Sequence, residues 1–304
     1  MLTTIQRIKM LECPNHHIDA VMDTDSYNEI DDQFAISLAL RSKEKINLKA
    51  LYSAPFHNHR SVGPEDGMIK SYNETLKLLR LAGENIPVFK GAKSYLPDES
   101  HAIESPSSSH LAQLAQQYTP EFPLYVIEIA AITNVASAIL MAPEIADRIV
   151  VVWLGGNALD WPHNDEFNCK QDVAAARVVL SCGCPLIMLP CLGVVSSFTT
   201  CQYELEHWFK GKNPLADYLQ QQAIEEAHTY AKDKVWTRVI WDITAVGWLL
   251  NDDDRFMLSR YESTPIPQYD NHWSRDSRRP LCRYVYAIKR DALYTEMIEK
   301  ICKR

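Results

Sequence analysis

Short apolar runs alternate with longer amphipathic patterns between residues 20 and 189. Most of the short runs are continuously apolar, which is typical of strands buried on both faces of a parallel sheet. The expected strands are residues 20–22, 48–52, 87–89, 124–129, 149–154 and 185–189. The expected helices between them are residues 33–40, 67–81, 108–117, 134–141 and 174–181. The pattern therefore predicts an α/β fold with a mostly parallel, Rossmann-like open sheet flanked by helices.

The remainder of the chain has a different pattern. Residues 199–250 are mainly helical in pattern, most clearly at 223–231 and 244–250. Residues 252–280 are rich in Asp, Pro and Ser and are expected to be irregular, followed by a late strand at 283–289 and a C-terminal helix that ends at Lys303. Because no repeat and no long linker separates these parts, we predict a single domain over residues 1–304 with helical insertions.

Composition narrows the class of protein. The 304 residues are 46% hydrophobic and 23% charged, as in a globular protein. The net charge of -8 and the absence of a long Lys/Arg-rich stretch argue against nucleic acid as a partner. We expect no membrane partner and a cytoplasmic location, because no apolar run is long enough to span a bilayer and the N-terminus lacks an apolar signal core. The eight cysteines lack paired CxxC spacing and are expected to be mostly reduced core residues.

The most informative chemistry is a cluster of four carboxylates within ten residues, where the first predicted strand gives way to the first predicted helix. The four are Asp23, Asp25, Asp31 and Asp32. Carboxylates this close repel one another, so the site either holds protons or binds a hard metal ion through oxygen. In open parallel sheets, ligands bind beyond the carboxyl ends of the strands. Residues 54–58, 130–134 and 155–168 are expected at the same edge.

This arrangement resembles the inosine-uridine-preferring nucleoside hydrolase family, whose first strand ends in D-x-D-P-G-x-D-D. The four acids match that motif, but residues 26–30 make the intervening loop two residues longer. Further family markers are matched at Glu166-Phe167-Asn168 with Asp172, at Trp241-Asp242, at the turn 130–134 that follows Ile129, and at Asn58.

The resemblance implies hydrolysis of the N-glycosidic bond of a small-molecule ribonucleoside by metal-activated water, to give ribose and a free base. It implies a Ca²⁺ site made by Asp25, Asp32, Asp242 and the Ile129 carbonyl. It also implies that Asp25 and Asp242 are the catalytic residues, with Asp25 as the general base. It also implies substrate contacts from Asp31, Asn58, Glu166, Asn168 and Trp241, and a homodimer or homotetramer. Trp241, where other members have His, favours purine ribosides through stacking. The residue types suit the chemistry independently, because oxygen ligands, a basic carboxylate and hydroxyl contacts all assist cleavage of a glycosidic bond.

Several alternatives remain open at this point. A magnesium-dependent phosphatase of the haloacid-dehalogenase type also uses D-x-D, but it does not account for Glu166-Phe167-Asn168 or Trp241-Asp242. The longer loop is compatible with a hydrolase of a non-nucleoside riboside or related carbohydrate, or with a ribose-ligand binder without turnover. Trp241 is alternatively a core residue beside Trp248. The group that protonates the leaving base is unassigned, and the candidate histidines are His57, His59, His101 and His163.

Overall fold

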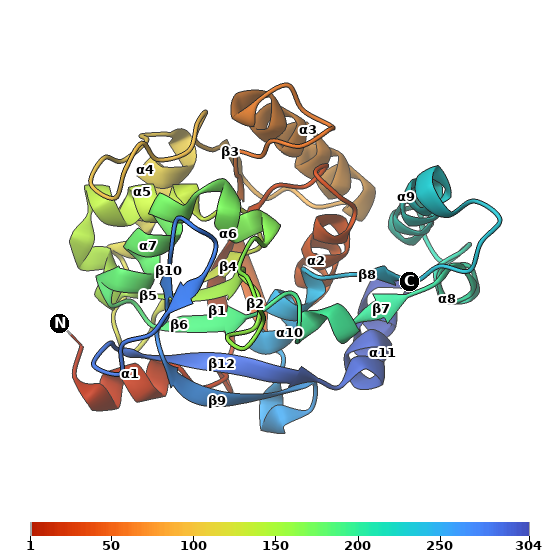
Figure 1. The fold of residues 1–304 in the computed structure, drawn as a ribbon. Coiled ribbons are helices and arrows are strands. Elements are labelled where there is room, and N and C mark those ends of the chain that lie inside the picture. The colour runs from red at the N-terminus through yellow and green to blue at the C-terminus, as the bar shows by residue number, and fades with distance from the viewer. Residues whose placement is uncertain (1, 304) are drawn as a thin grey trace.

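The computed structural model describes residues 2–303 and is built around an eight-stranded sheet (Figure 1). The strand order is β3-β2-β1-β4-β5-β6-β12-β9. The strands are β1 (Ile18–Thr24), β2 (Ile46–Ser53), β3 (Val88–Lys90), β4 (Leu124–Glu128), β5 (Ile149–Leu154), β6 (Leu186–Leu189), β9 (Met257–Ser263) and β12 (Leu281–Ile288). Neighbouring strands are parallel except at the edge, where β9 runs antiparallel to β12. The order reverses between β1 and β4, and such a reversal opens a crevice at the carboxyl ends of those strands.

Helices cover both faces of this sheet. The α-helices of residues 2–303 are α1 (Thr4–Met10), α2 (Asp31–Leu40), α3 (Pro64–Ala82), α4 (Pro106–Ala115), α5 (Thr133–Met141), α6 (Phe167–Gln171), α7 (Val173–Cys182), α8 (Gln202–Trp208), α9 (Pro214–Ala231), α10 (Ile243–Leu249) and α11 (Arg290–Ile301). Two small ribbons pair β7 (Thr199–Thr200) with β8 (Arg238–Val239) and β10 (Ile266–Pro267) with β11 (Trp273–Ser274). None of the helices in residues 2–303 is long and apolar enough to cross a membrane.

The continuous apolar runs arise because each strand contributes to two cores. In β5, Val150 and Val152 belong to the cluster that includes α2, α10 and α11, whereas Val151 and Trp153 belong to the cluster that includes α4, α5 and α7. Alternate side chains point to opposite faces, so a strand with a helix layer on each side is apolar at every position. The predicted parallel α/β fold is confirmed.

One part of the prediction is wrong. Residues 252–280 were expected to be irregular, but they contain β9 and the β10–β11 ribbon. The apolar signal of β9 is weak because it is an edge strand whose middle, at Arg260 and Tyr261, is exposed. The short strands β7 and β8 also interrupt the region predicted as helical. Local sequence does not mark these segments as strands. They are strands because β9 pairs with β12, β10 with β11, and β7 with β8.

Candidate active site

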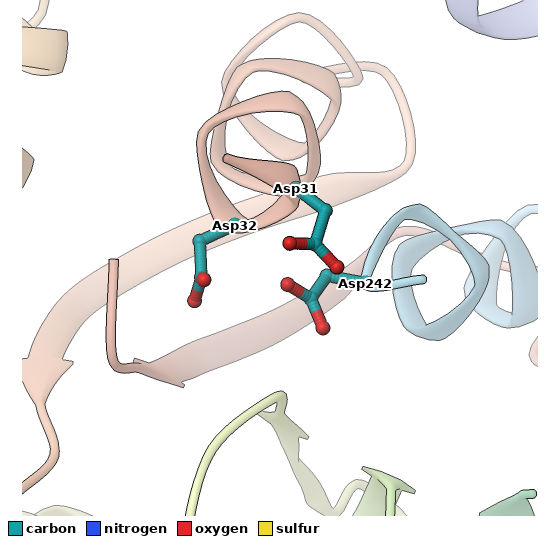
Figure 2. Close-up of side chains that lie close together, drawn as sticks. All are labelled: Asp31, Asp32 and Asp242. Atoms are coloured by element: carbon teal, nitrogen blue, oxygen red, sulfur yellow. The ribbon is translucent and has the colours of Figure 1, made fainter. Parts of the chain in front are cut away.

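Four buried carboxylates meet at the switch point of the sheet. Asp25 follows β1, Asp31 and Asp32 open α2, and Asp242 directly precedes α10. All four side chains are at most 4% exposed. Carboxylate oxygens of Asp31, Asp32 and Asp242 lie within 4.8 Å of one another (Figure 2). Packing of α10 against α2 therefore brings Asp242 to two acids from the other end of the chain.

The hydrogen bonds of these acids differ. Asp32 Oδ1 accepts from Thr24 Oγ1 at 2.5 Å, and Asp31 Oδ2 accepts from the backbone N–H of Trp241 at 3.2 Å. Both oxygens of Asp25 are buried, and neither has a hydrogen-bond partner within residues 2–303. A buried carboxylate without a donor is costly unless a proton or a cation compensates it.

Burial and mutual repulsion raise the pKa values of the cluster. The pKa values of Asp25, Asp32 and Asp242 are raised well above the usual range, first by burial and then by the neighbouring carboxylates. Burial also raises the pKa of Asp31 to about 7, with the charge of Arg238 opposing the shift. A divalent cation would allow all four groups to ionise together, so the oxygen-only donor set and the unpartnered Asp25 fit a hard cation such as Ca²⁺.

Asp23 is placed apart from this cluster. Its Oδ1 accepts from Asn134 Nδ2 at 3.0 Å, and its backbone carbonyl accepts from the N–H of Ile129 at 3.0 Å. These bonds tie the end of β1 to the turn after β4. They give Asp23 a supporting position and bring Ile129 to the crevice.

A cavity of about 300 Å³ opens beside the acids. Its lining residues follow the sheet order from the loop after β1 to the loop after β6. They are Asn28, Glu29, Asp31, Ile129, Leu154, Asn157, Asp165, Glu166, Phe167, Asn168, Lys170, Cys191, Leu192, Trp241 and Asp242. The volume is at the lower end of the range for small-molecule sites.

Most residues expected at the site meet in this cavity. Asp31, Ile129, Glu166, Asn168, Trp241 and Asp242 line it, and Asp25 and Asp32 adjoin the lining acids. The expected substrate contact Asn58 is not among the lining residues. Its Nδ2 donates to the backbone carbonyl of Asn28 at 3.1 Å and its Oδ1 accepts from the N–H of Arg60 at 2.8 Å, so its amide holds the loop after β1.

The wall opposite this loop is built around Glu166. The Glu166 carboxylate accepts from the backbone N–H groups of Gly156, Asn168 and Cys169 at 2.8–2.9 Å. Asn168 Nδ2 donates to the carbonyl of Leu154 at 3.0 Å. These bonds fix the start of α6 against the end of β5, and they orient Asn168 at the cavity wall.

Some lining residues had no role assigned from the sequence. Asn28 and Glu29 come from the lengthened loop, Asp165 and Lys170 flank the Glu166 segment, and Cys191 and Leu192 follow β6. The length of the loop and the positions after strand ends were the available signals. None of the four candidate histidines is among the lining residues. His163 Nδ1 contacts Asp165, however, and Asp165 lines the cavity.

A cavity lined by buried carboxylates, at the point where the strand order of an α/β sheet reverses, is typical of an α/β enzyme with a small-molecule site. The sequence model of the inosine-uridine preferring nucleoside hydrolases matches residues 20–294, and the chain belongs to this family. It is therefore an N-glycosyl hydrolase that acts on ribonucleosides. The search of curated proteins found no match to the chain.

Solved structures share the fold at low sequence identity. A plant nucleoside hydrolase is 20% identical with a TM-score of 0.73, covering 94% of this chain and 99% of its own. A purine-preferring ribonucleoside hydrolase from Gardnerella vaginalis is 20% identical with a TM-score of 0.75, covering 93% and 98%. An inosine-guanosine nucleoside hydrolase is 14% identical with a TM-score of 0.71, covering 94% and 98%.

Proposed function

We propose that this enzyme hydrolyses purine ribonucleosides to ribose and free base and requires Ca²⁺, held by Asp25, Asp32, Asp242 and the Ile129 carbonyl. The observation that carries the proposal is the unpartnered, fully buried Asp25 carboxylate beside three further carboxylates at the cavity. Calcium takes about six to eight oxygen ligands, which leaves room for water and sugar hydroxyls beside these protein oxygens.

The residues of the site then have distinct roles. A bound cation supplies charge that lowers the pKa of water and orients the sugar hydroxyls. Asp25, with both oxygens free of protein donors, takes the proton of the attacking water. Asp31 accepts a hydrogen bond from a ribose hydroxyl while its other contact, the Trp241 N–H, keeps it in place. Asn168 and Glu166 shape the opposite end of the sugar site.

The purine preference is supported by Trp241. Trp241 lines the cavity directly beside Asp242, where an indole ring would offer a flat face to a departing base. An electron-rich ring attracts a protonated, electron-poor purine in the way it attracts a cation. Two of the structural relatives are named for purine-preferring and inosine-guanosine hydrolysis, which agrees with this choice.

The test is release of ribose from inosine, guanosine and uridine, measured with Ca²⁺ and after chelation. We expect release from the purine nucleosides, its loss on chelation with recovery on adding Ca²⁺, and its loss in Asp25→Ala. No release from any common nucleoside with calcium bound would refute the proposal. A non-nucleoside riboside or related carbohydrate would then be the substrate to test, and binding without turnover would indicate a ribose-ligand binder.

We also propose a single-domain enzyme that is cytoplasmic and forms a homodimer or homotetramer. All eight cysteines carry free thiols, which is usual in a reducing compartment and supports the location. Light scattering of the purified protein would report the mass of the assembly, and a monomer at micromolar concentration would contradict the oligomer.

A further inference from the structure

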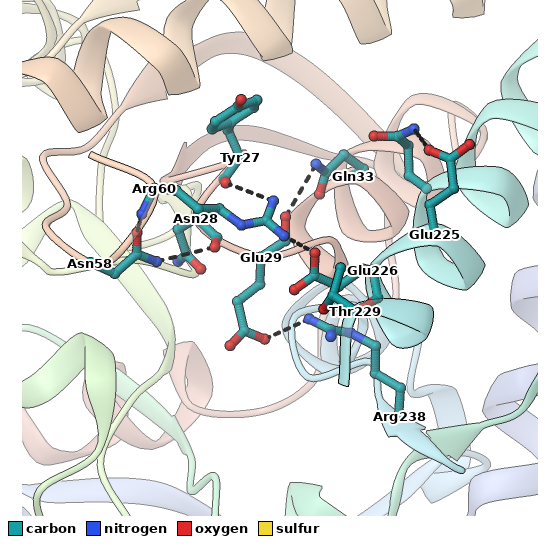
Figure 3. A network of polar contacts seen from close by, with 11 residues as sticks. Tyr27, Asn28, Glu29, Gln33, Asn58, Arg60, Glu225, Glu226, Thr229 and Arg238 are labelled. Atoms are coloured by element: carbon teal, nitrogen blue, oxygen red, sulfur yellow. Dashed lines mark hydrogen bonds and ion pairs between the residues drawn. The ribbon is translucent and has the colours of Figure 1, made fainter. Parts of the chain in front are cut away.

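The lengthened loop after β1, residues 26–30, is tied down at several points (Figure 3). Ser26 Oγ lies 3.0 Å from Thr75 Oγ1 in α3. Arg60 Nη1 donates to the carbonyl of Tyr27 at 3.4 Å, and the Arg60 guanidinium pairs with Glu226 of α9. With the bond from Asn58 to the Asn28 carbonyl, these contacts hold the loop in one position over the acids.

The loop turns two acceptor groups toward the cavity. Asn28 is 6% exposed and lines the cavity, and its Oδ1 has no hydrogen-bond partner in the described part of the chain. Glu29 also lines the cavity, and one of its oxygens, Oε2, accepts from Arg238 Nη2 at 2.9 Å. Its other oxygen accepts no hydrogen bond from residues 2–303. A buried amide oxygen without a donor is costly, so a donor from a bound ligand would be strongly favoured at Asn28.

The side chains of Asn28 and Glu29 have different surroundings, so they would contact different parts of a bound substrate. Asn28 lies beside Asp25 at the inner end of the loop, where its backbone N–H donates to the Asp25 carbonyl at 3.0 Å. Glu29 is half-exposed and paired with Arg238 of β8, which precedes Trp241 by three residues. The wall formed by Glu166 and Asn168 lies at the start of α6, which is hydrogen-bonded to the end of β5, two strands along the sheet from β1. A sugar between that wall and the acids would leave its base toward Trp241 and Glu29.

We propose that the loop supplies two substrate contacts: Asn28 accepts a hydrogen bond from a sugar hydroxyl, and Glu29 accepts hydrogen bonds from the N–H edge of the base. This inference rests on the proposed function and names its preferred substrate class. A carboxylate accepts only, and it best matches an edge with two adjacent donors. Guanine presents such an edge through N1–H and its 2-amino group, whereas hypoxanthine has N1–H alone, and uracil has one N–H between two carbonyls. The enzyme therefore prefers guanosine to inosine.

The experiment measures kcat/KM for guanosine and inosine in the calcium-loaded enzyme and in three variants. Glu29→Gln replaces one acceptor oxygen by a donor at equal size, and we expect it to lower the guanosine-to-inosine ratio about tenfold. Asn28→Ala should raise KM for both nucleosides and leave the ratio unchanged. Glu225→Gln is the matched control, because Glu225 is exposed on α9, bonded to Gln221 at 2.7 Å and absent from the cavity lining.

Each result separates the two proposals. A wild-type enzyme without a guanosine preference, or Glu29→Gln with an unchanged ratio, would overturn this inference while leaving ribonucleoside hydrolysis intact. A wild-type enzyme that releases ribose from neither nucleoside would overturn the purine function and this inference with it. The rise in melting temperature on adding calcium is measured in every variant. A variant that keeps this rise is folded, so a loss of activity in it does not come from unfolding.

Discussion

Replacing Asp242 by Asn should stabilise the cation-free protein and remove its response to calcium. Two ionised carboxylates separated by 4.8 Å repel by about 3.5 kcal/mol at an effective dielectric of about 20, and Asp242 has Asp31 and Asp32 within that distance. Its side chain accepts no capping hydrogen bond from the first turn of α10, so the amide loses none.

Protonation already relieves part of this repulsion. An acid whose pKa is raised on folding binds its proton more tightly in the folded state, so its burial costs stability as pH rises through the folded pKa, which is about 7 for Asp31. We therefore expect Asp242→Asn to raise the free energy of unfolding of the cation-free protein by about 2–3 kcal/mol at pH 8, and by less at pH 5, where the acids are protonated.

The assay is thermal unfolding at pH 8 and pH 5, with chelator and with Ca²⁺. At pH 8 without cation, the variant should melt about 3–5 °C above the wild type, given the entropy of unfolding expected for a chain of this size. Calcium should raise the melting temperature of the wild type and leave that of the variant unchanged. Asp291→Asn, whose side chain is 93% exposed, is the control and should change neither value.

A variant that melts below the wild type in chelator, or that keeps the full calcium response, would refute the electrostatic reasoning. The first result would mean that Asp242 stabilises the fold rather than straining it. The second would mean that the cation binds without this carboxylate.

Three further predictions concern the reaction. Asp25→Asn should lower kcat by about 10²–10⁴-fold, the usual contribution of a general base, with an unchanged circular dichroism spectrum; a smaller loss would assign the base elsewhere. Trp241→Leu should raise KM for inosine about tenfold and more than for uridine, because it removes the aromatic face; equal effects in steady-state assays would argue for a core role of Trp241. Asn58→Ala should raise KM for inosine severalfold with little change in kcat, because it releases the Asn28 carbonyl rather than a substrate contact; a loss of kcat alone would contradict this.

Much of the architecture could be predicted from local patterns. Continuous apolar runs mark strands buried on two faces, and their alternation with helical patterns specifies a parallel sheet whose carboxyl edge holds the ligand. Asp31 and Asp32 could be assigned to that edge because they lie at the start of the helix that follows the first strand. Edge strand β9 could not be found in this way, since its exposed middle carries no such pattern and only pairing with β12 makes it a strand.

The sequence by itself determined the fold class, the family and the identity of the acids, because strand burial and short-range carboxylate spacing are local properties. Tertiary structure decided which of these groups face one another. Packing of α10 on α2 brings Asp242 to Asp31 and Asp32, and burial leaves Asp25 without a donor. The orientation of the lengthened loop was equally beyond local reasoning, because it depends on contacts from α3, α9 and β8 that are remote in the chain. Asn58 donates to the carbonyl of Asn28 in this loop, and Asn28 lines the cavity.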